Sequence, residues 1–106
     1  MSGTTLRFPE ALLRRQCAAI LAGWGLEGEA LEACVDALID CDLRGIDSHG
    51  ISLLALFSNW MKSGQYDFGA KPKIEHEGPG HATIDAGNGL GFPASVFATR
   101  LAVEKA

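Results

Sequence analysis

The spacing of the apolar residues changes along this chain of 106 residues, and the change limits the folds that it can adopt. From residue 9 to residue 63, apolar side chains recur every three or four positions, which predicts amphipathic helices. Between Lys73 and Asp85 they alternate on either side of Gly78-Pro79-Gly80, which predicts a β-hairpin. A glycine-rich turn follows, and Pro93 then leads into a helical pattern up to the last residue. We therefore predict an α+β fold of about three helices, one hairpin and a further helix.

Start and stop signals divide the first part of the chain into three predicted helices, at about residues 9–23, 29–43 and 50–63. Pro9 is tolerated at the start of a helix, and Gly45 and Gly64 suit the left-handed turn that ends one. Asp47 or Ser48 can cap the third helix, because a short side chain accepts from its free N–H groups. The predicted apolar stripes consist of Leu13, Cys17, Ile20, Leu21 and Trp24, then Leu31, Cys34, Val35, Leu38 and Ile39, then Leu54, Phe57, Trp60 and Met61.

The composition favours a globular domain and argues against two classes of partner. With 47% hydrophobic residues, a chain of this length can bury a core without metal ions or disulfides. The net charge is −4 and there is no run of Lys or Arg, so we expect neither nucleic acid nor an anionic membrane as partner. No apolar stretch approaches the roughly 18 residues of a membrane span, and no secretory signal is recognisable at the start. We therefore expect a cytoplasmic protein.

The side chains that most often bind metal ions are not spaced as ligands. Cys17, Cys34 and Cys41 are odd in number and form no Cys-x-x-Cys pair, so we interpret them as small buried apolar residues. His76 and His81 flank the hairpin turn and are interpreted as exposed hairpin residues. We predict no metal site.

The glycines at positions 87, 89 and 91 resemble a phosphate-binding turn only in part. A dinucleotide-binding fingerprint, G-x-G-x-x-G, would need glycine at position 92, where the chain has Phe92. The preceding strand also belongs to a hairpin instead of a βαβ unit. We therefore interpret the segment as a tight turn that needs positive φ values.

The segment Asp42–Gly50, between the second and third predicted helices, concentrates side chains that could carry out chemistry. Histidine titrates near neutrality, so His49 could exchange a proton with the oxygen of a carbonyl or hydroxyl group. Asp47 could orient the imidazole ring, and Ser48 could hydrogen-bond the substrate oxygen. Arg44 could bind a carboxylate through two hydrogen bonds.

A purely structural interpretation of the same segment is equally open on these residues. In that case Asp47 and Ser48 cap the third helix, and Arg44 pairs with an acid on the second helix. His49 would then have no chemical role.

The run from Asp42 to Ile51, which contains Arg-Gly-Ile-Asp-Ser-His-Gly, resembles the N-terminal signature of the malate/L-lactate dehydrogenase family. The family is distinct from the Rossmann-type lactate and malate dehydrogenases. The Lys62-Ser63-Gly64 segment and the Ile-Asp-Ala-Gly-Asn-Gly-Leu-Gly turn at 84–91 are also similar to the family. The resemblance therefore covers nearly the whole chain.

The resemblance implies hydride transfer between NAD or NADP and a small 2-oxo or 2-hydroxy acid. His49 would be the catalytic acid and base, with Ser48 and Asp47 beside it. Ser48 and His49 would lie near the nicotinamide, and Arg44 would contact the substrate. A non-Rossmann fold and a homodimer are implied as well.

Two departures from the family keep a second hypothesis open. The arginine that usually follows the histidine by four residues is Leu53 here, and Ala55 replaces a proline. The family also continues past 106 residues, through the segments that bind most of the cofactor. We therefore expect a single domain at 1–106, with a helical part at about 9–64 and a hairpin and helix at about 72–106. It would be the N-terminal, truncated part of a larger oxidoreductase, inactive alone. The alternative is a non-catalytic helical module for interaction or oligomerisation, derived from the same scaffold.

Overall fold

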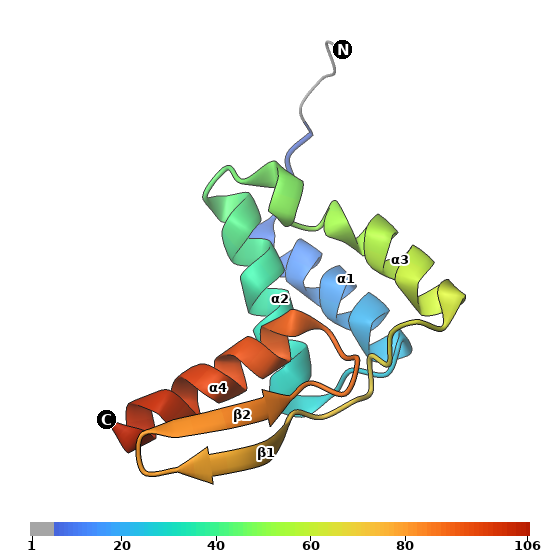
Figure 1. The fold of residues 1–106 in the computed structure, drawn as a ribbon. Helices are drawn as coiled ribbons and strands as arrows, with labels where there is room; N and C mark the ends of the chain where they lie inside the picture. Colours follow the sequence, from blue (N-terminus) through green and yellow to red (C-terminus); the bar gives the residue numbers. More distant parts are fainter. Residues whose placement is uncertain (1–5) are drawn as a thin grey trace.

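A computed structural model describes residues 6–106 and has a helical part and a hairpin part that meet on one helix (Figure 1). Its elements in chain order are α1 (Glu10–Gly23), α2 (Gly28–Leu43), the 3-10 turn η1 (Asp47–His49), α3 (Leu53–Ser63), β1 (Lys73–Gly78), β2 (His81–Asp85) and α4 (Gly91–Lys105). The predicted α+β arrangement is confirmed. Within residues 6–106, no helix is both long enough and apolar enough to cross a lipid bilayer.

Helix α2 connects the two parts of the structure. It packs against α1 along the helical part and against α4 beside the hairpin, and its C-terminal end leads into η1 (Figure 1). The largest fully buried side chains come from α1 and α2: Leu21, Leu38, Ile39, Cys17 and Cys34. Burial of these apolar side chains is the main source of stability for the helical part.

Glycines end α2 and α3 as predicted. At the end of α2, Gly45 has φ 77° and donates its N–H to Asp42 O, while Ile46 N–H reaches Cys41 O at 2.8 Å. This pair of hydrogen bonds satisfies carbonyl groups that the helix leaves free, in the arrangement of a Schellman motif. Gly64 ends α3 with φ 75°. Both glycines are explained by their positive φ, since a side chain at either position would meet open space.

The predicted start of the third helix is wrong. Asp47 and Ser48 lie in η1, α3 begins at Leu53, and neither side chain caps it. A backbone carbonyl of the preceding turn takes the place of a side-chain cap. Leu53 N–H, at the start of α3, donates to Gly50 O at 3.0 Å. Ser52 Oγ also donates back to Asp47 O at 2.7 Å, which joins η1 to the start of α3.

Aromatic rings join α3 to the segment that follows it. Trp60 stacks on Tyr66 with 4.5 Å between the ring centroids, and Phe57 contacts Phe68 edge-on at 6.3 Å. Phe68 also contacts Trp24 at the end of α1, at 5.8 Å. Phe57 and Phe68 are buried, so this aromatic cluster closes the core over α1 and α2.

Some side chains that were expected to be buried are exposed or only partly buried. Ile20 is 41% exposed and Met61 is 40% exposed, because the elements packed on α1 and α3 cover only one side of each helix. Cys41 is partly exposed near the end of α2, whereas Cys17 and Cys34 are buried as predicted. The spacing of apolar residues locates the face of each helix, but the width of the covered stripe depends on its neighbours.

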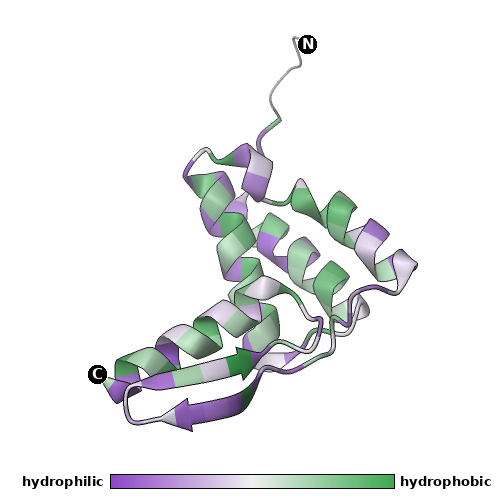
Figure 2. Ribbon diagram, viewed as in Figure 1, coloured by the Kyte–Doolittle hydropathy of each residue, from purple (hydrophilic) through white to green (hydrophobic). Residues whose placement is uncertain are grey.

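The hairpin is a two-stranded antiparallel sheet turned by Pro79 and Gly80, with an irregularity before His76 in β1. One face of the sheet packs on α4, and Lys105 of that helix donates to Gly78 O at 2.8 Å. β1 is hydrophilic along most of its length (Figure 2), and His76 is exposed as predicted.

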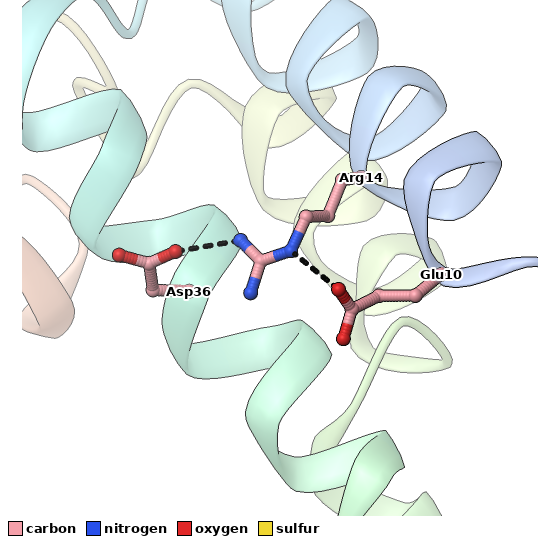
Figure 3. A network of polar contacts seen from close by, with 3 residues as sticks. All are labelled: Glu10, Arg14 and Asp36. Atoms are coloured by element: carbon pink, nitrogen blue, oxygen red, sulfur yellow. Dashed lines mark hydrogen bonds and ion pairs between the residues drawn. The ribbon is translucent and has the colours of Figure 1, made fainter.

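An ion-pair network links the outer faces of α1 and α2 (Figure 3). Arg14 Nη1 donates to Asp36 Oδ1 at 2.6 Å, and Arg14 Nε lies 3.6 Å from Glu10 Oε2. The hydrogen bond with Asp36 raises the pKa of Arg14 above its usual value. Because these groups are exposed to solvent, we expect the network to contribute little to stability.

The buried thiol of Cys34 makes the stability depend on pH. Burial raises its pKa from 9.0 to about 12, with a smaller contribution from Cys17. The folded state therefore retains a proton that the unfolded thiol loses, and the free energy of unfolding should fall as the pH rises from about 9 to about 12. Urea unfolding of the native chain and of Cys34→Ala, at about pH 8 and about pH 11, measures this fall. An equal pH dependence of the two proteins would contradict the prediction.

Candidate active site

The junction between α2 and α3 presents the predicted site residues to solvent. Arg44 follows the last turn of α2, and Asp47, Ser48 and His49 form η1. All four side chains are exposed. The local cause is the sharp turn at Gly45, which leads the chain out of α2 before η1 begins.

Ser48 and His49 are in direct contact. Ser48 Oγ lies 2.8 Å from His49 Nδ1, so one of these two atoms donates a hydrogen bond to the other. The contact engages Nδ1, so Nε2 is the ring nitrogen of this exposed side chain that can meet a ligand. Asp47 was predicted to orient the ring, but in the structure the ring's partner is Ser48.

Arg44 lies close to an acid of its own helix. Its Nε is 3.0 Å from Asp40 Oδ2, and the two side chains are 71% and 57% exposed. The contact agrees with the structural interpretation of Arg44 as the partner of an acid on the second helix. Because an exposed pair contributes little free energy, the guanidinium group can exchange Asp40 for the carboxylate of a ligand.

A cleft of about 670 Å³ lies beside η1, between the start of α1 and the end of α2. Its lining contains three acids and one cation: Glu10, Asp42, Asp47 and Arg7. The apolar part of the lining includes Phe8 and Leu43, which are 55% and 61% exposed. The acids make the cleft unfavourable for an anionic ligand.

The glycine-rich turn before α4 uses its own backbone amides. Gly87 and Asn88 have φ 63° and 64°, so the predicted need for positive φ is confirmed at Gly87, whereas Gly89 and Gly91 do not have a positive φ. Gly87 N–H donates to Asp85 Oδ1 at 2.8 Å, and Gly89 N–H donates to Ala86 O at 3.0 Å. A phosphate group needs such amides to be free, so the amides of Gly87 and Gly89 do not fit one.

The sequence of this protein matches the family described as malate/L-lactate dehydrogenase over residues 8–106. The chain belongs to the malate/L-lactate dehydrogenase family. It is 35% identical to malate dehydrogenase of Pyrococcus abyssi over 101 residues, which cover 95% of the chain and 28% of that relative. It is 33% identical to L-sulfolactate dehydrogenase of Methanocaldococcus jannaschii over 87 residues, 82% of the chain and 25% of that relative.

Solved structures of malate dehydrogenases show the same fold over this segment. The malate dehydrogenase of Pyrococcus horikoshii superposes with a TM-score of 0.86 at 31% identity, over 94% of the chain and 29% of that structure. The malate dehydrogenase of Entamoeba histolytica gives a TM-score of 0.89 at 28% identity, over 96% of the chain and 28% of that structure. The chain therefore spans less than a third of the length of these relatives.

Asp42 is a residue of the family signature to which the sequence interpretation gave no role. Its Oδ2 accepts the N–H of Ile51 at 2.9 Å, across the whole junction. The spacing offered a signal, because an Asp in the last turn of a helix can reach amides that lie beyond the following turn. The intervening conformation decides which amide it reaches, and that conformation was not predicted.

Proposed function

We propose that this chain provides the proton donor and acceptor of a nicotinamide-dependent dehydrogenase that acts on small 2-hydroxy acids. The contact between Ser48 and His49 carries the proposal, because it engages Nδ1 of an exposed imidazole and leaves Nε2 as the nitrogen for a ligand. The matched relatives are named malate and sulfolactate dehydrogenases, which supports this class of substrate. We further propose a cytoplasmic enzyme that acts as a homodimer.

The proposed proton transfer involves His49 and the oxygen on C2 of the substrate. In the direction of reduction, His49 as imidazolium donates a proton from Nε2 to the developing alkoxide. In the direction of oxidation, neutral His49 accepts the proton of the hydroxyl group. Ser48 keeps Nδ1 engaged and thereby orients the ring during both steps.

The described residues fit one end of a nicotinamide cofactor. The cofactor, when bound, supplies or accepts the hydride at C2 of the substrate. The Ser48 hydroxyl and the His49 ring are exposed polar groups that could contact the nicotinamide amide group. The amides of Gly87 and Gly89 are occupied, so we expect the cofactor phosphates to be held outside residues 6–106.

Arg44 is the proposed contact for the substrate carboxylate. It is 71% exposed and follows α2 directly, in the same junction as His49. Leu53 cannot replace the usual arginine of the family, because its side chain is apolar and packs against the core. A carboxylate that displaces Asp40 from Arg44 would gain up to two hydrogen bonds with the guanidinium group.

Nicotinamide turnover tests the proposed function. We expect the 106-residue chain alone to leave NADH and NADPH unchanged in the presence of 2-oxo acids. We define the extended form as the chain continued to the length of its relatives. The extended form should oxidise NADH or NADPH in the presence of a 2-oxo acid. The absorbance of the reduced cofactor measures turnover by both forms. The same assay with malate or sulfolactate as substrate measures turnover in the opposite direction. An extended form without turnover in either direction would contradict the proposal and favour a non-catalytic interaction module.

A further inference from the structure

The carboxylate of Asp42 holds the far end of the junction that carries η1. Asp42 belongs to the last turn of α2 and its side chain is half-buried. Oδ2 accepts the N–H of Ile51 at 2.9 Å, nine residues further along the chain. Hydrogen bonds to an ionised carboxylate are about twice as strong as those between neutral groups, so this contact is a strong tether.

Gly50 shows how closely the Asp42 carboxylate approaches the backbone. A Cβ atom at position 50 would overlap all three carboxyl atoms of Asp42. The φ of Gly50 is −94°, which is not a positive φ that would require glycine. The close approach of the Asp42 side chain does require it.

Two consecutive residues of α2 therefore accept hydrogen bonds from the two ends of the junction. At the entry, Cys41 O accepts the N–H of Ile46 at 2.8 Å. At the exit, the Asp42 carboxylate accepts the N–H of Ile51. Between them, η1 contributes one short backbone hydrogen bond, from His49 N–H to Ile46 O at 3.0 Å. The position of η1 relative to α2 depends on these two tethers.

We propose that Asp42 is a positioning residue for His49, a role that rests on the proposed function of that histidine. Its tether places Gly50 and Ile51 against α2, so the residue before them keeps a defined backbone position. A defined backbone in turn keeps the His49 ring in contact with Ser48. Proton transfer is sensitive to displacements of about 1 Å, which gives the tether a consequence for catalysis.

Nuclear magnetic resonance of the 106-residue chain tests the role of Asp42 without any turnover. In Asp42→Ala, we expect exchange of the Ile51 amide proton to accelerate about tenfold or more, because the charged acceptor is lost. The ring ¹⁵N signals of His49 should shift as well. Asp42→Asn retains a side-chain oxygen and should restore both signals towards those of the native chain. Asp36→Ala, which removes an exposed carboxylate of the same helix, should change neither.

Gly50→Ala tests the same contact from the other side. The added methyl group displaces the carboxylate and should release the Ile51 amide while Asp42 remains in place. Circular dichroism reports whether Asp42→Ala folds. If it does not fold, Gly50→Ala is the variant that tests the proposal. A folded Asp42→Ala or Gly50→Ala chain with native His49 ring signals would overturn the positioning role. That result would leave the proposed function standing, since nicotinamide turnover tests it separately.

Discussion

Replacing His49 with alanine in the extended form should lower kcat by about 10²- to 10⁴-fold, the usual contribution of general acid-base catalysis. The structure gives the physical reason, since Ser48 engages Nδ1 of the His49 ring and no second imidazole lies in η1. His49 is exposed and makes no contribution to the core, so the variant should fold like the native protein. Steady-state turnover with saturating cofactor measures the effect.

His76→Ala is the matched control for this prediction. His76 is also an exposed histidine, but it lies in β1 of the hairpin part, away from the junction. Its replacement should leave kcat unchanged. Native turnover in His49→Ala, or an equal loss in both variants, would remove the role assigned to His49.

Leu38→Ala should destabilise the chain by about 2–5 kcal/mol, as deletion of a buried leucine side chain commonly does. Leu38 is 0% exposed in the middle of α2, between the side chains of the core. Its loss leaves a cavity in the core, which also contains Leu21 and Ile39, and the packed helices can fill that cavity only in part. For a domain of about this size, each kcal/mol lowers the melting temperature by about 4–8 °C, so thermal unfolding reports the effect clearly.

Leu43→Ala separates burial from the loss of a leucine as such. Leu43 lies on the same helix but is 61% exposed, so its replacement should change the free energy of unfolding by about 0.5 kcal/mol or less. Comparable destabilisation by the two variants would contradict the assignment of the core to the face of α2 that carries Leu38.

The helices and the hairpin could be predicted because their signals are local. Gly45 and Gly64 end helices through their own φ values, and Pro79-Gly80 turns a hairpin between alternating segments. The start of α3 could not be predicted in this way. It depends on Gly50 O as acceptor for Leu53 N–H, and nothing in the identity of these two residues indicates that contact.

The core was predicted where it follows helical spacing and missed where it does not. Phe68, Leu26 and Leu90 are 5%, 3% and 4% exposed, yet all three lie in connecting segments without a period. Their burial depends on how the segments fold back over α1 and α2, which is a property of the tertiary structure. The opposite error at Met61 has the same origin, because the elements packed on α3 cover only one side of that helix.

The candidate site was predicted as a set of residues, and the structure supplies their pairing. The motif indicated Ser48 and His49, and the structure adds the contact of 2.8 Å between Ser48 Oγ and His49 Nδ1. Arg44 pairs with Asp40, as the structural interpretation of the segment expected. The tether from Asp42 escaped prediction because it depends on the path of the chain from Gly45 to Ile51.

Transfer of a labelled hydride tests the central claim most directly. The extended form is mixed with NADH or NADPH that carries deuterium at the transferred position of the nicotinamide, together with a 2-oxo acid. Mass spectrometry and nuclear magnetic resonance then locate the label in the product. A 2-hydroxy acid with one deuterium at C2 is the predicted result, with the hydroxyl proton derived from solvent through His49. A product without deuterium at C2, or no product with either cofactor, would contradict the account.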